Sequence, residues 1–437
     1  MMRDVILEIN NNSSRVFVVD GTRTPFLKAK GVGPFSASDL AVQAGTSLFN
    51  RLSIEANQVD EVIIGAAMPG PDEANIARII AMRLGCGHQV PAFTVMRNCA
   101  SGMQAIDTGA QHIAMGRAQL VLVGGTEAMS RAPILYDLAM ANWLANWMST
   151  KSFAGKAKMI AAFRPSFLRP VIGLLRGLTD PLIGMNMGQT AEELAYRFEI
   201  DRLSMDEFAY KSHHALATAY AEGLMSEVTP IIDAKGKVYS QDTGLRADVT
   251  LEGLAKLRPV FDKTFGQVTA GNSSQVTDGA CLLLLASEAA IKTHQLPVLG
   301  EIIDCDWQAL DPKYMGLGPA HAVASLLTKH ELNLNDIDTL EINEAFAVQV
   351  LACLEAWNDR DYCQAELALK HALGAFDRTK LNPEGGAIAI GHPIGASGAR
   401  IVLHVLNTLK KKNLKRGIAT LCIGGGQGGA MLLETGE

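Results

Sequence analysis

Residues 382–400 read NPEGGAIAIGHPIGASGAR, and the rest of the chain can be organised around this stretch. An apolar run, Ala387 to Ile390, ends at Gly391-His392-Pro393, and small residues then open a helical pattern. Glycine permits unusual backbone dihedrals, and proline fixes a turn. We therefore predict that this turn holds the His392 imidazole at a fixed point at the end of a strand. The alternative from this stretch alone is a tight connection with an incidental histidine.

A second copy of this pattern occurs earlier in the chain. Ala100-Ser101-Gly102 and Ala396-Ser397-Gly398 each start a predicted helix, and each helix leads to an apolar strand that ends in glycines, at 120–125 and 418–426. A single three-residue match is weak evidence, but here the flanking elements also follow in the same order. The sequence therefore indicates an internal duplication.

Strands and helices alternate in both halves. In the second half, 298–303 reads as a strand and 318–327 as a helix. Alternation of this kind predicts βαβ units and an α/β fold with parallel strands. The first half gives strands at 15–20, 59–66, 92–96 and 120–125 and helices at 38–52, 75–84 and 103–115. We expect a first half at 1–125, an inserted loop domain at 126–270 with helices in 187–221, the remainder of the first half at 271–297, and a second half at 298–437.

Composition excludes several classes of protein. The 437 residues are 48% hydrophobic and 19% charged, which is typical of a packed globular chain. A net charge of −6 gives no overall field that favours nucleic acid. Seven cysteines without a CxxC pair indicate neither a zinc site nor a disulfide framework, so we expect reduced thiols and a cytoplasmic location. The first twenty residues lack the pattern of a signal peptide, and no apolar run is long enough to span a membrane.

Three further residues lie at positions where catalytic or ligand-binding side chains are common. Cys99 lies between a strand and a helix N-terminus, where the helix dipole is expected to lower the thiol pKa and free N–H groups can bind an oxyanion. Cys422 lies at the mouth of a glycine-rich turn, and Asn343 follows a strand, where its amide can donate to an oxyanion or hold a water. The structural alternatives are two core cysteines and a helix-capping asparagine.

The duplication predicts that His392 takes the place in the second half that Cys99 has in the first. One histidine and two cysteines would then lie at strand ends of two equivalent halves, which is where α/β folds place ligands. This combination favours acyl-thioester chemistry.

Four blocks of the sequence resemble the signature blocks of the thiolase family, and the similarity extends over essentially the whole chain from Arg23-Thr24-Pro25-Phe26 onward. The resemblance implies two copies of a βαβαβαββ unit stacked as a five-layered αβαβα core, with a loop domain inserted in the first copy. It also implies homodimers, often paired into tetramers. The blocks are Asn98-Cys99-Ala100-Ser101-Gly102, Asn343-Glu344-Ala345-Phe346, Gly391-His392-Pro393 and Cys422-Ile423-Gly424-Gly425-Gly426.

The resemblance also implies a mechanism. Cys99 would be the nucleophile that is acylated by a 3-ketoacyl-CoA, and His392 would take its proton. Cys422 would protonate the acetyl-CoA enolate and then deprotonate the incoming CoA, and the reverse sequence is a Claisen condensation. One oxyanion would be bound by His392 with a water held by Asn343, and the other by the N–H groups of Cys99 and Gly424. Coenzyme A is a substrate in this scheme, and no cofactor or metal is expected.

Substrate-binding positions follow from the same resemblance. Arg246 would contact the nucleotide end of CoA, and Ala270 and Ser274 would contact the pantetheine arm. Met187 and Phe346 would line the acyl pocket. The alternatives are a surface arginine, a loop serine and ordinary core residues.

The chain departs from the short-chain biosynthetic thiolases in two places. It has Asn186-Met187-Gly188 where that subgroup has His-Met-Gly, which argues against specialisation for acetoacetyl-CoA, although a biosynthetic acetoacetyl-CoA thiolase remains the alternative. The segment 141–179 appears in a longer loop and holds six basic residues, no acidic one and several aromatic ones. Such a segment suits an anionic membrane surface or a partner groove, or else forms a solvated lid.

This loop resembles that of the thiolase subunit of fatty-acid oxidation trifunctional complexes. The resemblance implies β-oxidation of medium or long acyl chains, and contact with a hydratase/dehydrogenase subunit or a membrane. Two other functions are possible on the same fold. A ketosynthase-like condensing enzyme usually has a histidine in place of the second cysteine, so Cys422 argues against it. A non-catalytic lipid-binding relative tends to lose one of the blocks, and here all four are intact.

Overall fold

The computed structural model describes residues 15–436. Most of the N-terminal segment that we expect not to be a signal peptide, residues 1–14, lies outside the described residues. In the part that is described, no helix is both long and apolar enough to cross a membrane.

The two predicted halves each form a mixed α/β unit. Strand β1 continues to Arg23, past the turn expected at Gly21, because a register shift after Val18 lets Thr22 keep pairing with Leu282. The first half consists of β1 (Val16–Arg23), α2 (Ala37–Phe49), β3 (Glu61–Gly65), α3 (Ile76–Arg83), β4 (Ala92–Val95), α4 (Ser101–Ala114), β5 (Leu120–Ala128) and β10 (Thr277–Ser287). The second half consists of β11 (Gly300–Ala309), α12 (Gly318–Lys329), β12 (Thr339–Ile342), α13 (Ala347–Asn358), α16 (Ile394–Lys412), β13 (Arg416–Ile423) and β14 (Gln427–Glu434).

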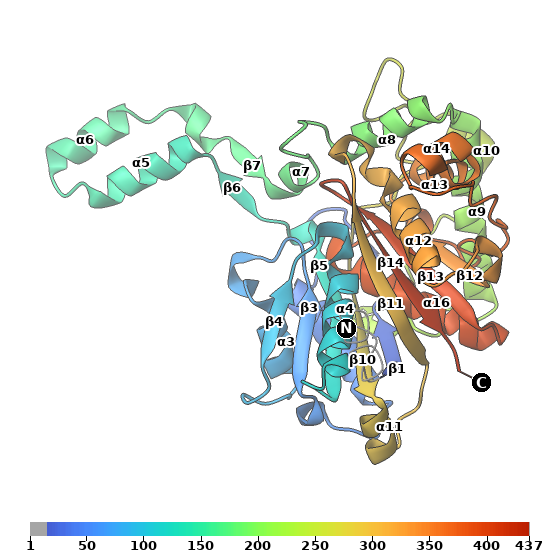
Figure 1. The fold of residues 1–437 in the computed structure, drawn as a ribbon. Coiled ribbons are helices and arrows are strands. Elements are labelled where there is room, and N and C mark those ends of the chain that lie inside the picture. Colours follow the sequence, from blue (N-terminus) through green and yellow to red (C-terminus); the bar gives the residue numbers. More distant parts are fainter. Residues whose placement is uncertain (1–14, 437) are drawn as a thin grey trace, which may run out of the picture.

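Within residues 15–436, ten strands join in one sheet, in the order β12-β13-β14-β11-β1-β10-β5-β3-β4 with β2 (Leu27–Lys28) beside β10. Strands β3, β4 and β5 are parallel, as are β12 and β13, which confirms the predicted α/β fold. Within the described residues, strands of the two halves pair with each other only where Val16–Val18 lie opposite Gly300–Ile302, so the two half-sheets separate beyond that contact. Helices α4 and α16 pack between them, and α2, α3 and α12 cover the outer faces (Figure 1). Every residue of β5 and β10 is buried, as expected for strands covered on both faces.

The contact between α4 and α16 requires two glycines. A Cβ on Gly102 would lie 2.8 Å from the backbone nitrogen of Ala399, and a Cβ on Gly398 would lie 2.6 Å from that of Met103. The two contacts are equivalent when the Ala-Ser-Gly triplets are superposed, since each glycine meets the residue that follows the other. This geometry supports the internal duplication inferred from the sequence.

The apolar run before His392 is not a strand. Residues Ala387–Ile390 form the short helix α15, which corrects the prediction of a strand end at this point. The Ile388 N–H donates to Glu344 Oε2 at 3.1 Å, and the Gly391 N–H closes a helical turn on the Ala387 carbonyl at 2.8 Å. A four-residue apolar run carries too little periodicity to separate a strand from a helix. Gly391 then takes a φ of +114°, a conformation that few other residues adopt.

Residues 134–172 form a long projection that we call the arm. Figure 1 shows its two helices, α5 (Leu138–Ser149) and α6 (Phe153–Ala161), held away from the body on a ribbon of β6 (Ile134–Tyr136) and β7 (Pro170–Ile172). The aromatic residues of the predicted basic segment pack on one another, with Trp143 stacked on Trp147 and edge-on to Phe163. The arm therefore projects from its domain and does not lie on it as a closed lid.

The arm returns to the body through the short helix α7 (Gly173–Gly177). Two further helices, α8 (Met187–Arg197) and α9 (Arg202–Ala221), occupy the stretch predicted to be strongly helical. The small helix α10 (Leu251–Ala255) and the two-residue strands β8 (Ile231–Ile232) and β9 (Val238–Tyr239) complete the loop region.

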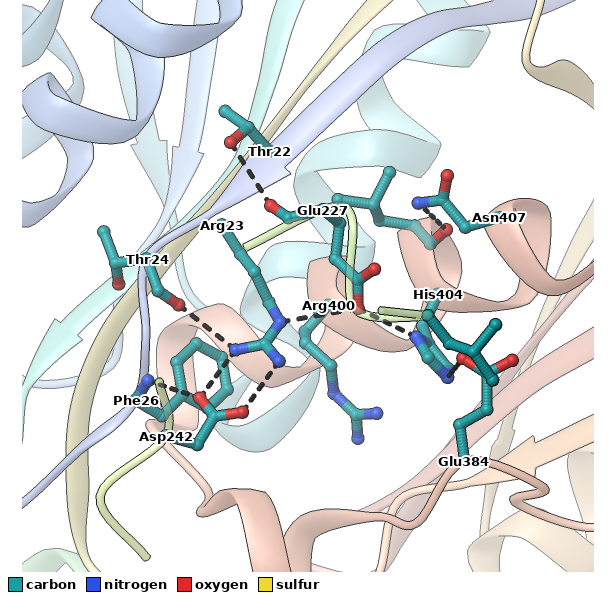
Figure 2. A network of polar contacts seen from close by, with 12 residues as sticks. Thr22, Arg23, Thr24, Phe26, Glu227, Asp242, Glu384, Arg400, His404 and Asn407 are labelled. Carbon is teal, nitrogen blue, oxygen red and sulfur yellow. Dashed lines mark hydrogen bonds and ion pairs between the residues drawn. The ribbon is translucent and has the colours of Figure 1, made fainter. Parts of the chain in front are cut away.

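A buried ionic network ties this loop region to the core (Figure 2). Arg23 at the end of β1 makes a two-pronged contact with Asp242, at 2.7 and 2.8 Å. Glu227 lies 3.7 Å from Arg23 and 2.9 Å from His404 Nδ1 on α16. His404 Nε2 is in turn 3.5 Å from Glu384. The network joins β1, the segment after α9 and the middle of α16, and so fixes the loop region against the helix that begins beside His392.

Candidate active site

One cavity collects most of the predicted site residues. Its volume is about 320 Å³, and its wall combines both halves of the fold with the loop region. Seven of the ten predicted residues line it: Cys99, Met187, Ser274, Phe346, His392, Cys422 and Gly424. The structure thus brings the histidine and the two cysteines together, although they lie up to about 320 positions apart in the sequence.

Cys99 reaches the cavity from a short 3-10 turn, Asn98–Ala100, that connects β4 to the first residue of α4. Asn98 takes a φ of +45°, which asparagine tolerates better than most residues. Its side-chain N–H donates to the Gly424 carbonyl at 2.8 Å. This bond holds the nucleophile's turn against the glycine-rich turn of the second half.

The Cys99 thiol is less acidic than its position at a helix start suggests. Burial raises its pKa, and the N–H groups of Gly424 and Cys99, which hydrogen-bond to the sulfur and lower the pKa, offset burial only in part. The expected net lowering is therefore wrong, because the low polarity around the sulfur outweighs the helix dipole and the N–H groups. A thiolate here requires a proton acceptor close by.

Cys422 lies near the end of β13 and is 1% exposed. Burial raises its pKa well above the ordinary thiol value, and the neighbouring Cys99 raises it further. Cys422 is thus a neutral thiol at physiological pH, which is the form that can donate a proton.

His392 lies between α15 and α16, with its ring on the cavity wall. Its Nδ1 is 2.5 Å from Ser397 Oγ. Burial, assisted by the positive charge of Arg400, lowers the pKa of His392 to about 4. The ring is therefore neutral at physiological pH, as a proton acceptor must be.

The duplication does not relate His392 to Cys99 in the way predicted. Superposing the two Ala-Ser-Gly triplets pairs Cys99 with Gly395 and pairs His392 with Met96. His392 lies five positions before Ser397, whereas Cys99 lies two positions before Ser101. Three residues of the longer spacing form the first turn of α16, which begins at Ile394, whereas α4 begins at Ser101. His392 reaches the cavity one helical turn earlier than its expected counterpart.

Three predicted residues are not part of the cavity wall. Asn343 directly follows β12 and is fully buried, and neither of its amide atoms has a hydrogen-bond partner in the described part of the chain. Unpaired buried amides are costly, so such a group favours a polar molecule beside it. Arg246 is half-buried and its backbone N–H donates to His213 Nδ1 at 3.2 Å, while Ala270 is exposed.

The sequence did not indicate much of the apolar wall. Leu175 of α7 and Leu178 after it come from the root of the arm. The remaining apolar members include Met129, Phe261, Met315 and Ile394. Isolated apolar residues in loops carry no periodic signal, so they become recognisable only once the fold places them.

The arrangement suits covalent catalysis. A thiol near a helix start (Cys99), a neutral imidazole (His392) and a second, neutral thiol (Cys422) face one largely apolar space with backbone N–H donors beside it. Among residues 15–436, no three His, Cys, Asp or Glu side chains gather to hold a metal ion.

Comparisons with known proteins identify the family of the chain. Residues 16–289 match the family description "Thiolase, N-terminal domain", and residues 296–435 match "Thiolase, C-terminal domain". The human mitochondrial trifunctional enzyme subunit beta is 36% identical over 97% of this chain and 89% of its own length. A 3-ketoacyl-CoA thiolase of Yersinia pestis is 34% identical over 98% of both chains. The structure of human mitochondrial 3-ketoacyl-CoA thiolase in complex with CoA has a TM-score of 0.83 at 35% identity, covering 97% of this chain and 98% of that chain.

Proposed function

The chain belongs to the thiolase family, and we propose that it catalyses the CoA-dependent cleavage of 3-ketoacyl-CoA to acetyl-CoA and a shortened acyl-CoA, as in fatty-acid β-oxidation. The observation that carries this proposal is the single cavity faced by Cys99, His392 and Cys422. Coenzyme A is a substrate, and these three side chains supply the acid–base chemistry without a separate cofactor. Asn186, in place of the histidine of short-chain biosynthetic thiolases, does not favour the biosynthetic alternative.

In the proposed reaction, the proton of the Cys99 thiol passes to His392 as the sulfur attacks the 3-keto carbon. The C2–C3 bond breaks, the acyl group stays on Cys99, and the enolate of acetyl-CoA takes the Cys422 proton. The Cys422 thiolate then deprotonates CoA, whose sulfur displaces the acyl group from Cys99. Cys99 leaves as a thiolate and recovers its proton from His392, which returns the site to its starting state. The raised thiol pKa values of both cysteines support this scheme, because each thiol keeps its proton until the step that uses it.

Two sets of donors would stabilise the oxyanions. The backbone N–H groups of Gly424 and Cys99 act on the Cys99 sulfur by lowering its pKa, and they would lie beside the carbon that this sulfur attacks. The second set would be His392 with a water held by Asn343. The unpartnered amide of Asn343 supports that role within the described residues.

The acyl chain would lie along the apolar wall of the cavity. Met187 and Phe346 take part in this wall, as predicted, and Leu175 and Leu178 extend it to the root of the arm. Ser274 would contact the pantetheine arm from the same cavity, whereas Arg246 and Ala270 would bind CoA outside it.

The arm is the proposed contact for a partner. Its exposed apolar side chains include Leu138, Met148, Phe153 and Ile160, with Phe153 92% exposed, and its charged residues are all basic between 138 and 179. We assign this surface to a hydratase/dehydrogenase subunit or to an anionic membrane. We also propose a homodimer or tetramer, and a cytoplasmic location on the basis of the reduced cysteines.

Thiolysis across chain lengths tests the function. Adding CoA to acetoacetyl-CoA and to 3-ketoacyl-CoAs of increasing length should remove the magnesium–enolate absorbance, with the highest kcat/KM at medium or long chains. Activity confined to acetoacetyl-CoA would favour the biosynthetic alternative. No activity with any chain length would overturn the proposal.

A second experiment tests the arm. Flotation with anionic liposomes and co-purification with a hydratase/dehydrogenase subunit should each be compared between the full chain and a Phe153→Ser, Ile160→Ser variant. The variant keeps the Trp143–Trp147–Phe163 cluster, so its arm should still fold. If the full chain neither floats with the liposomes nor co-purifies with the subunit, we would conclude that the arm is a solvated projection without a binding role.

A further inference from the structure

The serines at the centre of the two repeated triplets make the same kind of contact. Ser101 and Ser397 are 0% and 1% exposed, and each hydroxyl reaches back to a carbonyl before its own residue. Ser101 Oγ donates to the Asn98 carbonyl at 2.7 Å, and Ser397 Oγ donates to the Pro393 carbonyl at 3.0 Å. The mechanism described above leaves both hydroxyls without a role.

The direction of the hydrogen bonds is certain at Ser101. Its Oγ also receives the N–H of Arg97 at 2.9 Å, and a backbone N–H can only donate. Since a serine has one hydroxyl proton, that proton must point at the Asn98 carbonyl. Ser101 thus accepts on one side and donates to a main-chain oxygen on the other.

The same logic assigns the proton at Ser397. Its Oγ lies 3.0 Å from the Pro393 oxygen, and two oxygens at that distance require a proton between them. A carbonyl oxygen has no proton to give, so the Ser397 hydroxyl supplies it. The contact of 2.5 Å between Ser397 Oγ and His392 Nδ1 then needs the proton of Nδ1.

We propose that Ser397 is a positioning residue that holds the His392 ring in the tautomer with the proton on Nδ1, so that unprotonated Nε2 faces the Cys99 side of the cavity. This inference rests on the proposed function, in which His392 takes the Cys99 proton. In the part of the chain that is described, Nε2 has no hydrogen-bond partner of its own, and the ring lines the cavity.

The tautomer matters because the ring is neutral. A neutral imidazole has one nitrogen that accepts a proton and one that donates. Burial and Arg400 keep His392 neutral by lowering its pKa to about 4, so only the correct tautomer can act as a base toward Cys99. With the opposite tautomer, Nε2 would present a proton to the thiol, and neither group could accept.

The first test compares Ser397→Ala in two backgrounds. In the otherwise unchanged enzyme, we expect the kcat of thiolysis to fall about 10–100-fold with little change in KM, the range seen when the partner that orients a functional imidazole is removed. In a His392→Ala background, Ser397→Ala should cause no further loss, because the serine acts through the ring. Thr408→Val is the matched control on the same helix, since the Thr408 hydroxyl is buried and has no partner in the described residues.

The second test reads the tautomer directly and needs no serine variant. The ring ¹⁵N signals of His392, assigned by their absence from His392→Ala, should show a protonated Nδ1 and a bare Nε2. A proton on Nε2 overturns the inference. So does a Ser397→Ala variant with full activity, or one that loses the same factor in both backgrounds.

The outcomes also separate this inference from the proposed function. A fully active His392→Ala variant would overturn the role of His392 as the base, and the role of Ser397 with it. An inactive His392→Ala beside a fully active Ser397→Ala would overturn the role of Ser397 alone.

Discussion

Helices α4 and α16 are copies of one element, and they meet each other through the same pair of glycines. Their surroundings nevertheless differ in kind. At equivalent positions, α4 has Gln104 and Thr108, which hydrogen-bond to each other at 2.9 Å, whereas α16 has Arg400 and His404, which are buried among carboxylates. At these two positions, one copy carries neutral side chains and the other carries charged ones.

The strand ends beside these helices differ in the same way. Asn343 and Cys422 stand in the second half where the first half has Gly65 and Thr126. Cys99, the proposed nucleophile, is conversely matched by Gly395. A Cβ at Gly395 would lie 2.5 Å from the Thr126 carbonyl, so the first half's version of the site is filled by backbone. The duplication produced two similar half-structures, but the proposed reaction centre is assembled only once, from residues of both halves.

The largest expected effect comes from removing Cys422. Cys422→Ala should lower the rate of thiolysis about 10²–10⁴-fold, the range for a positioned acid or base, while Cys99 still becomes acylated. The enolate assay measures turnover, and mass spectrometry measures acyl-Cys99. Thr126→Ser at the equivalent position in the other half should leave activity unchanged, because a serine can keep the 2.7 Å bond to the Ala37 carbonyl. Near-normal thiolysis by Cys422→Ala would remove that residue from the mechanism.

The second test makes α16 resemble α4. Arg400→Gln removes the ion-pair partner of Glu341, and both side chains are at most 2% exposed. This leaves Glu341 buried with His404 Nε2, 3.9 Å away, as its remaining ion-pair partner in the described residues, and should lower the free energy of unfolding by about 3–5 kcal/mol, measured by urea denaturation. Gln104→Ala, at the equivalent position of α4, loses hydrogen bonds at 2.9 Å to Thr108 and at 3.4 Å to Asp107, and should cost about 0.5–1.5 kcal/mol per bond. Equal losses in the two variants would contradict the contrast between the helices.

A third variant tests the feature that the helices share. Gly398→Ala places a Cβ 2.6 Å from the Met103 nitrogen, so α4 and α16 must move apart. We expect a loss of about 1–3 kcal/mol, seen as a lower melting temperature. Gly70→Ala is the control, because a Cβ there meets nothing within 4 Å and the φ of −66° suits any residue. A melting temperature equal to that of the control would show that the helix contact tolerates the extra carbon.

The smallest expected effect is a pH dependence of the stability that comes from His404 on α16. Burial lowers the pKa of His404, but Glu341, Glu227 and Glu384 outweigh burial and raise it above its ordinary value. The stabilisation by the charged ring is therefore complete below about pH 6.5 and is lost as the pH rises through the folded-state pKa. His404→Gln should lower the melting temperature more at pH 6 than at pH 9. A constant difference would mean that His404 is neutral in the folded protein.

Glu227, the carboxylate partner of His404, contributes to stability with the opposite pH dependence. Burial raises the pKa of Glu227, but His404 and Arg23 outweigh it and lower the pKa to about 2. Its contribution is therefore present above the ordinary value near 4.5 and is lost as the pH falls toward 2.

Much of the fold was predictable because its signals are local. Alternating strands and helices, and two Ala-Ser-Gly helix starts in matching order, predicted the α/β class and the duplication. Cys99, His392 and Cys422, which the structure places on one cavity, were predicted as a site because reactive residue types stood beside glycine-rich turns. Long-range effects were not predictable. Residues 387–390 turn into a helix through Glu344, over forty positions away, and the pKa of Cys99 depends on burial that no short stretch reveals.

The sheet register has a consequence for biosynthesis. Apart from an isolated bridge between Arg23 and Val228, strand β1 pairs with β10 and β11 within residues 15–436, and its first residue, Val16, lies opposite Ser287 and Ile302. At a translation rate of about 5–20 residues per second, β1 leaves the ribosome on the order of 10–60 s before either neighbour exists. During that time the nascent chain carries an unpaired strand, VFVVDGTR, while the arm and the loop helices are still being made. The first half therefore cannot close during synthesis until the whole insertion has emerged, which makes this interval the point at which a chaperone would be needed.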